Sequence, residues 1–141
     1  MGNYLINHVF DNMKRKLHNF EKLQAWQTAA RIDKSIYSLT KTFPNKEQYI
    51  LISQIQRASI SICSNIAEGS GRRIGKEQGQ FYKIAYSSLL EVINQLLLAI
   101  NRDYLTEEQF IQTFENDIFI LKNQLRALYK FTTNGQNAIP T

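Results

Sequence analysis

The sequence has very little of the residue types that catalysis and metal binding most often use. It contains one cysteine and two histidines, and both histidines, His8 and His18, lie within the first nineteen residues. A single thiol cannot form a disulfide within the chain, and Cys63 has no second cysteine or nearby histidine for a metal site. The Glu-x-x-His pairs of di-iron bundles and the HExxH zinc motif are both missing. The sequence therefore predicts neither a metal nor a cofactor, and Cys63 is interpreted as a small buried apolar residue.

Long apolar runs are also missing. The longest one, Leu96 to Ile100, is far short of the ~20 residues that a membrane span needs. The basic residues near the N-terminus follow its weakly apolar stretch, which reverses the order of a secretory signal, and no small-residue cleavage site follows them. Signals for β-strands are absent as well. We therefore expect an all-α protein with a cytoplasmic location and no membrane partner.

Three features that would suggest an enzyme are incomplete or have a structural interpretation. Ser70 to Glu77 superficially resembles a phosphate loop, but serine replaces its first glycine, glutamate replaces its Ser/Thr, and no strand precedes it. A serine nucleophile would need a base within hydrogen-bond reach, and the predicted helices contain no histidine. Glu68 and Glu91 could in principle act as acid and base, although a structural polar pair is the favoured interpretation. The sequence predicts that the chain is not an enzyme.

Helical periodicity, in contrast, runs through most of the chain. Apolar residues recur at spacings of three and four over about residues 22–43, 46–68, 76–102 and 106–131. Pro44, the glycine-rich connector Gly69 to Gly75 and a capping box at Thr106 to Gln109 separate these segments. They predict an antiparallel, up-down-up-down four-helix bundle over residues 20–131. We expect residues 1–19 to form a flexible N-terminal arm and residues 132–141 a frayed tail.

The second and third predicted helices carry more apolar surface than one four-helix core needs. Ile50, Ile60 and Cys63, for example, lie outside the main apolar stripe of the second helix. Excess apolar surface of this kind usually marks an interface. The chain is therefore expected to form a homo-oligomer.

Positive charge is concentrated in the first half of the chain. The net charge is +5, and residues 1–75 contribute a surplus of six positive charges. Two clusters are candidates for binding nucleic acid: Lys14, Arg15, Lys16 and Lys22 in and beside the arm, and Arg72, Arg73 and Lys76 on the connector. At a helix start, guanidinium groups, backbone amides and the helix dipole can together hold phosphate. The alternative, ordinary solvated surface, stays open for each cluster, although oligomerisation would multiply the phosphate contacts.

Polar residues at helical spacing suggest a second kind of site. Arg57, Ser61, Asn65 (or Ser64) and Glu68 lie along the second helix, and Ser87, Ser88 and Glu91 lie along the third. If these sides meet, Arg57 can pair with Glu91 while the hydroxyls and Asn65 satisfy the remaining donors, since buried charge must be paired. Such a network would fix the register of the two helices. The alternative, that these are solvated residues, is equally open from the spacing alone.

Several motifs carry a family resemblance that covers about residues 20–131. They are Phe20-x-x-Leu23-x-x-Trp26-x-x-Ala29, Gln54-x-x-Arg57-Ala58, Ser64-Asn65-Ile66-Ala67-Glu68-Gly69, Phe81-x-x-Ile84-Ala85 and Ser88-Leu89-x-Glu91. With these motifs the chain resembles the bacterial four-helix-bundle proteins related to 23S rRNA intervening-sequence proteins. It departs from them at Gln56, where the family often has arginine, and at Ser87 and Asp103, where the family often has glycine. Arg57, Asn65, Glu68 and Glu91 match recurrent polar positions, which favours the structural network.

The resemblance implies a left-handed bundle that assembles as a ring, commonly a homopentamer, with no known catalytic activity. Relatives are encoded within intervening sequences of rRNA genes. The distantly similar accessory variability proteins of diversity-generating retroelements use a basic ring to bind a reverse transcriptase and nucleic acid. We therefore expect a non-enzymatic homo-oligomer that binds RNA or DNA, as a ribonucleoprotein accessory factor. The alternative is a protein-interaction scaffold for a partner such as a reverse transcriptase.

Overall fold

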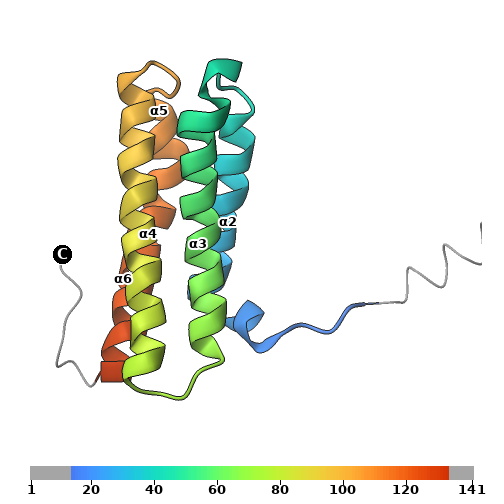
Figure 1. Ribbon diagram of the computed structural model, residues 1–141, viewed down its shortest axis with the longest axis vertical. Helices are drawn as coiled ribbons and strands as arrows, with labels where there is room; N and C mark the ends of the chain where they lie inside the picture. Colours follow the sequence, from blue (N-terminus) through green and yellow to red (C-terminus); the bar gives the residue numbers. More distant parts are fainter. Residues whose placement is uncertain (1–13, 134–141) are drawn as a thin grey trace, which may run out of the picture.

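Four helical rods pack side by side along most of the chain (Figure 1). The computed structural model describes residues 14–133. The first rod is α2 (Gln24–Thr40), and the third is α4 (Lys76–Asn101). The second rod consists of three elements in continuous succession: η2 (Asn45–Glu47), η3 (Gln48–Ile52) and α3 (Ser53–Ser70). The fourth rod likewise consists of α5 (Glu107–Phe110), η4 (Ile111–Glu115) and α6 (Asn116–Thr133). A short turn, η1 (Asn19–Lys22), precedes the first rod, and no strand occurs within the described residues. The predicted all-α four-helix bundle is confirmed.

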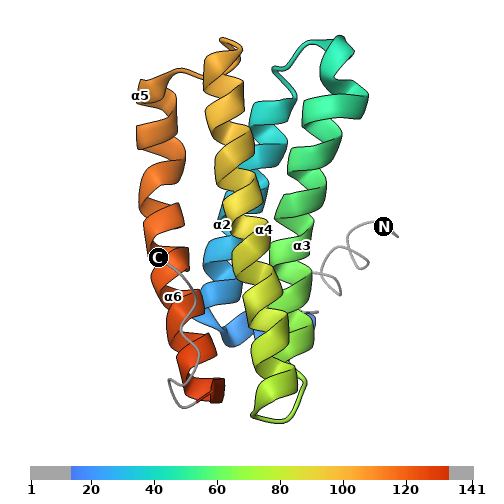
Figure 2. The ribbon, with the colours of Figure 1, turned by 60° about the vertical axis from the view of Figure 1, so that its left-hand side comes forward.

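Consecutive rods lie next to one another, and the chain reverses direction at each connection (Figures 1 and 2). Each rod packs against two others, so that the order around the bundle is α2, α3, α4, α6. Short connections between long helices favour this arrangement, because the chain has too few residues there to cross the bundle. The left-handed turn of the bundle and its assembly into a ring stay predictions.

The core lies where the apolar stripes predict it. The largest fully buried side chains come from all four rods: Ile32 and Ile36, Ile55, Ile62 and Ile66, Leu89, Val92 and Leu96, and Phe114, Leu121 and Leu125. Within each rod these residues recur at spacings of three, four or seven, which places them on one side of a helix. Burial of this continuous apolar interior stabilises the bundle.

Small residues bring α3 and α4 into close contact. A β-carbon built on Gly69 would lie only 2.9 Å from the β-carbon of Phe81 and 2.9 Å from the ring of Tyr82. Further along the same seam, the Ser61 and Ser88 hydroxyls are 2.8 Å apart. Gly69 and Ser61 of α3 thus let the α4 backbone approach closely.

The helix ends follow the expected chemistry. The Gln109 amide donates to the Thr106 hydroxyl at 3.1 Å, and the Thr106 amide donates to the Gln109 side chain at 2.9 Å, so the predicted capping box is formed. At the end of α4, Asp103 has φ 60°, and the Tyr104 amide donates to the Ala99 carbonyl at 2.9 Å. The residue in this left-handed conformation at a helix end is usually glycine. The family that the sequence resembles also often has glycine at this position.

The last helix is longer than its pattern predicts. Helix α6 continues to Thr133, and Thr132 is buried, with its hydroxyl donating to the Tyr129 carbonyl at 2.7 Å. The predicted helix end at Phe131 is therefore two residues short. Thr132 fits because Gly79 on α4 has no side chain: a β-carbon there would lie 2.7 Å from the Thr132 hydroxyl. Residues 134–141 of the predicted tail and residues 1–13 of the predicted arm lie outside the described residues.

Helix α4 also meets the length and composition requirements of a membrane span. Its mean hydropathy over the best window is 1.3, and 39% of that window is buried inside the bundle. A core helix that packs against neighbours on two sides has the same composition, so this likeness is weak evidence for a span.

Candidate nucleic-acid interface

The two predicted basic clusters lie in the same half of the bundle. Lys14, Arg15 and Lys16 lead into η1, which packs against α2 and α3, and Lys22 ends η1. Arg72 and Arg73 lie on the connector between α3 and α4, and Lys76 begins α4. In Figure 1 both segments are in the lower half of the molecule. Folding therefore brings these clusters toward one end, although more than forty residues separate them in sequence.

Contacts across the helices define where the two halves divide. Ser61 bonds Ser88 across α3 and α4, Tyr86 bonds Arg126 across α4 and α6, and Ser59 bonds Asp33 across α3 and α2. A plane near these contacts divides the bundle into two halves. The basic half is defined as residues 14–30, 60–89 and 122–133, and the upper half as residues 31–59 and 90–121.

The charge difference between the halves is large. The basic half holds eleven Lys and Arg but only three Asp and Glu, whereas the upper half holds six basic and eight acidic side chains. The basic half thus carries a surplus of eight positive charges and the upper half a surplus of two negative charges. A concentrated field of one sign attracts a polyanion more strongly than the modest net charge of the whole chain suggests.

Four basic residues of this half escaped the sequence prediction: Lys83 on α4, and Lys122, Arg126 and Lys130 on α6. They are separated along the chain and form no run, so composition gave no signal. The reversal of chain direction places the start of α4 beside the end of α6 and brings their charges to the same half. The Arg126 guanidinium donates to the Tyr86 hydroxyl at 2.9 Å, which fixes one of these cations on the α4–α6 face.

The connector is more firmly held than its glycines suggest. The buried Gln78 side chain donates to the Gly69 carbonyl at 2.9 Å and to the Arg72 carbonyl at 3.3 Å. The Arg72 guanidinium lies 5.2 Å from the centre of the Phe81 ring and 3.6 Å from the carboxylate of Glu77. Arg73 and Lys76 are exposed. The connector therefore presents positive charge from a backbone with defined hydrogen bonds.

The segment before α2 is held by one acidic residue. Glu21 accepts hydrogen bonds from the Arg15 guanidinium and from the His18 amide, the latter at 2.7 Å. These bonds, with the Arg15 hydrogen bond as the largest contribution, lower the pKa of Glu21 to about 2. Arg15 itself is exposed, as are Lys14, Lys16 and Lys22. The part of the predicted arm that the structure describes is therefore attached to the bundle by specific contacts.

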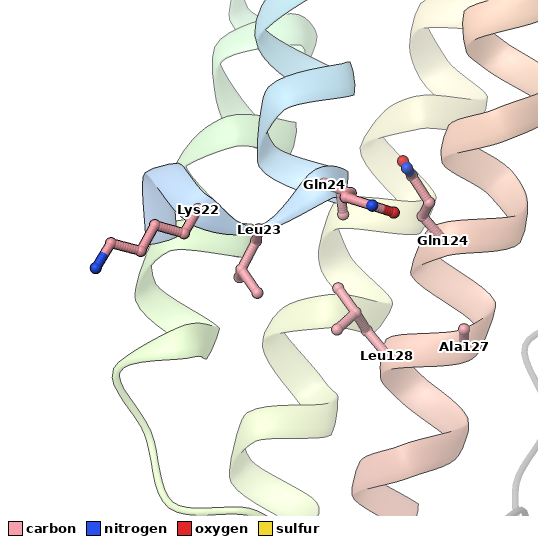
Figure 3. Close-up of a pocket in the computed structure, with 7 residues that line it drawn as sticks. Lys22, Leu23, Gln24, Gln124, Ala127 and Leu128 are labelled. Atoms are coloured by element: carbon pink, nitrogen blue, oxygen red, sulfur yellow. The ribbon is translucent and has the colours of Figure 1, made fainter. Parts of the chain in front are cut away.

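A shallow groove lies beside this segment, between the start of α2 and α6 (Figure 3). Its volume is about 420 Å³, and Leu23, Ala25, Ala127 and Leu128 supply the apolar part of its lining. Gln24 and Gln124 are its neutral polar residues, and the Lys22 side chain extends away from it in the close-up. The groove thus brings no acid, base or nucleophile together.

The predicted polar network is formed only in its uncharged part. The Ser61 and Ser88 hydroxyls share a hydrogen bond, and the Asn65 side chain donates to the Ser61 carbonyl at 2.8 Å and to its hydroxyl at 3.2 Å. Asn65 was predicted with Ser64 as an alternative, and Ser64 is exposed. These bonds link α3 to α4 near the middle of the bundle.

The charged part of that prediction is wrong for the single chain. Arg57, Glu68 and Glu91 are all exposed, and within residues 14–133 no salt bridge joins Arg57 to Glu91. The Ser61 and Ser88 hydroxyls occupy the α3–α4 seam, and the charged side chains lie on the outer surface. Ser87 is also exposed.

An ionic cluster around one buried carboxylate, which the sequence did not suggest, ties the loops of the upper half together. The buried Glu47 carboxylate accepts from the Arg102 guanidinium at 3.2 Å and from the Tyr104 hydroxyl at 3.0 Å. The Tyr104 ring packs on Phe43, with 5.2 Å between ring centres. Burial, followed by the hydrogen bond to Glu47, raises the pKa of Tyr104. These contacts join the α2–α3 loop to the α4–α5 loop and are a structural clamp.

The remaining candidate for chemistry is Cys63. It is half-buried rather than fully buried, and burial, with a smaller contribution from the charge of Asp33, raises the pKa of its thiol to about 12. Such a thiol is a poor nucleophile at neutral pH, because the thiolate is the reactive form. Among residues 14–133 no group of three or more His, Cys, Asp and Glu side chains is arranged to hold a metal ion.

The comparison with known families gives a match over most of the chain. The model of the family described as 23S rRNA-intervening sequence protein matches residues 21–127. This range begins within η1 and includes α2, α3, α4 and most of α6. No curated protein was found that matches the chain.

Proposed function

The chain belongs to the 23S rRNA-intervening sequence protein family, and from this we propose that it is a non-enzymatic, oligomeric RNA-binding protein that contacts phosphates through its basic half. One observation carries this proposal: eleven of the seventeen Lys and Arg residues lie in one half of the bundle with only three acidic residues. Release of counterions from neutralised phosphates supplies most of the affinity in binding of this kind. A role as an accessory factor in a ribonucleoprotein is consistent with it.

The first test is an electrophoretic mobility shift with a structured RNA over a series of salt concentrations. The affinity is expected to fall steeply as salt rises. Each phosphate contact contributes close to one unit to the slope of the logarithm of the binding constant against the logarithm of the salt concentration. The triple variant Arg72→Ala/Arg73→Ala/Lys76→Ala is expected to bind at least about tenfold more weakly at low salt and to lose about one unit of slope per removed contact. A DNA of the same sequence shows whether binding depends on ribose.

A matched control comes from the upper half of the same chain. Lys34→Ala/Lys41→Ala/Lys46→Ala removes three exposed lysines and changes the net charge by the same amount. It is expected to bind RNA nearly as well as the wild type. Equal losses in the two triple variants, or no shift of wild-type protein at low salt, would contradict RNA binding by the basic half. A chain that assembles but binds no RNA favours instead the protein-interaction scaffold, with a partner such as a reverse transcriptase.

For the oligomer we propose a left-handed bundle that assembles head-to-tail into a ring, as a homopentamer. Two exposed apolar surfaces on different sides of the bundle support this. One is a groove of about 440 Å³ on α3 and the segment before it, lined by Tyr49, Arg57 and Ile60 among others. Gln56, also in this lining, donates to Thr40 of α2, so the groove lies toward the α2–α3 side.

The second apolar surface lies on α4 and α6 and consists of Leu90, Leu97 and Phe119, which are 46%, 50% and 65% exposed. Phe119 precedes Arg126 by seven residues and so shares its side of α6, which faces Tyr86 of α4. By the order of the helices, this surface is on the opposite side of the bundle from the α3 groove. Two different surfaces that contact each other make a heterologous interface, which closes into a ring when the rotation permits.

Ile60→Glu is expected to convert the oligomer to smaller species in sedimentation velocity at micromolar concentration, because it places a charge in an apolar contact. Ile74→Glu is the matched control: Ile74 is 66% exposed, compared with 58% for Ile60, but lies on the connector outside both apolar surfaces. We expect this control to assemble normally. Wild-type protein that sediments as a monomer would exclude the ring.

A further inference from the structure

A short stack of aromatic rings lies among the exposed lysines that precede α2. The His18 and Phe20 rings are nearly parallel, with an interplanar angle of 4° and ring centres 5.7 Å apart. Phe20 in turn lies 5.4 Å from Trp26 at an angle of 59°. We call these three residues the aromatic stack. Sequence patterns do not indicate this stack, because Trp26 falls on a helical stripe and the other two rings lie in a segment without any periodicity.

Exposure decreases along the aromatic stack from one end to the other. His18 is exposed, Phe20 and Trp26 are half-buried, and Trp26 packs against the core. The inner end is therefore fixed by the bundle, while the outer ring, His18, is accessible to solvent. An exposed ring in a stack offers a flat surface on which a further planar group can lie.

The backbone around the aromatic stack is held in place before any ligand binds. The Glu21 carboxylate accepts from the His18 amide, and the Gln27 side chain donates to the Glu21 carbonyl at 2.8 Å. Arg15 pairs with the same carboxylate, which is only 9% exposed. The one acidic side chain of η1 is thus compensated by its own partner. A preformed site of this kind loses less conformational entropy on binding than a flexible arm would.

Positive charge flanks the aromatic stack on both sides in sequence. Lys14 and Lys16 precede His18, and Lys22 follows Phe20; all three are exposed. Aromatic rings interleaved with cationic side chains are the combination that binds single-stranded nucleic acid, in which unpaired bases stack on the rings and phosphates contact the cations. Bases inside a duplex cannot reach such rings, because their faces are covered by their neighbours.

We propose that the aromatic stack binds unpaired bases, so that the RNA class recognised here is single-stranded, with His18 as the ring on which a base lies. The proposal rests on the RNA binding proposed above and specifies its ligand. The connector cations Arg72, Arg73 and Lys76 contribute phosphate contacts that single strands and duplexes share. The aromatic stack then adds a contact that only an unpaired strand can make.

The test compares His18→Ala with wild type on two labelled RNAs: an oligouridylate of about twelve nucleotides and a duplex of the same length. Loss of one stacked base is expected to weaken oligouridylate binding about five- to hundredfold and to leave duplex binding within about twofold. His18→Tyr keeps a flat ring and is expected to restore binding. Trp26, the only tryptophan of the chain, supplies a second readout through its fluorescence on titration with oligouridylate.

The matched control is Tyr37→Ala, which removes a 57% exposed aromatic ring from α2 in the upper half, outside both apolar surfaces. It is expected to leave both affinities unchanged. If His18→Ala binds oligouridylate as well as wild type, or loses no more than Tyr37→Ala, the aromatic stack does not bind bases. In that case the loss of binding by the Arg72→Ala/Arg73→Ala/Lys76→Ala variant still supports the proposed function. If wild type binds neither RNA at low salt, both proposals fail.

Discussion

Replacement of Gly69 by alanine is expected to destabilise the bundle by about 1 to 3 kcal/mol. This change in stability is opposite in sign to the usual one, because alanine in a helix interior normally stabilises the helix by about 1 kcal/mol relative to glycine. Here the new methyl group would lie 2.9 Å from the Phe81 β-carbon. That atom is bonded directly to the α4 backbone and cannot move away by a side-chain rotation. Helix α4 must shift outward as a whole, which loosens its contacts with α3.

Thermal unfolding followed by circular dichroism at one fixed protein concentration measures this effect. A lower midpoint by several degrees is expected for a domain of this size. Gly71→Ala is the matched control, because Gly71 lies only two residues further along the chain. A methyl group added at Gly71 would lie 3.6 Å from its nearest neighbour, the Glu68 carbonyl oxygen. If Gly69→Ala is as stable as Gly71→Ala, the close approach of α3 and α4 is not required for folding.

The second large effect is expected when Arg102 is removed from the structural clamp. Arg102→Met leaves the Glu47 carboxylate, whose side chain is only 8% exposed, with the Tyr104 hydroxyl as its remaining partner. Removing one member of a fully buried ion pair costs about 3 to 5 kcal/mol. Because the Arg102 side chain is 42% exposed, solvent already screens part of the interaction. We therefore expect a loss of about 2 kcal/mol.

A double-mutant cycle tests whether the loss comes from the unpaired charge. Glu47→Gln removes that charge, so Glu47→Gln/Arg102→Met is expected to lose less stability than the two single losses added together. Arg31→Met is the control, since Arg31 pairs with Asp117 at 3.0 Å on the surface, with 54% and 21% of their side chains exposed. Its effect is expected to stay below about 1 kcal/mol. Additive effects in the cycle, or an equal loss in the control, would show that the clamp is unimportant.

The fold could be predicted because each helix carries its own local signals. The 3-and-4 spacing of apolar residues places Ile55, Ile62 and Ile66 on one side of α3, and Thr106 with Gln109 marks the start of the last rod. Such signals need no knowledge of the other helices. The missed end of α6 illustrates the limit, because Thr132 continues the helix only where Gly79 of α4 leaves room for it.

The site was harder to predict, because it depends on residues that are far apart along the chain. Residues 76–141 carry a net charge of −1, because the cations of α4 and the last rod are offset by acids that lie mostly at the other end. Lys83 and Lys130 belong to the basic half, while Glu91, Glu107 and Glu108 belong to the upper half. Only the reversal of chain direction separates these charges in space.

The error at the α3–α4 seam concerns which polar residues the seam encloses. Helical spacing correctly placed Ser61, Asn65 and Ser88 between the two helices, but it does not report how far apart the helices are. At the observed approach, two hydroxyl groups in direct contact fill the space. Arg57 and Glu91 lie outside that space, on the outer surface.

The unequal halves of the bundle also determine how the molecule approaches a polyanion. A rod with positive charge at one end and negative charge at the other carries an electric dipole along its length. Near RNA, the field exerts a torque that rotates the rod until its basic end leads. The rotation takes place during diffusion, before any contact forms, so a larger share of encounters begins with the basic half facing the RNA.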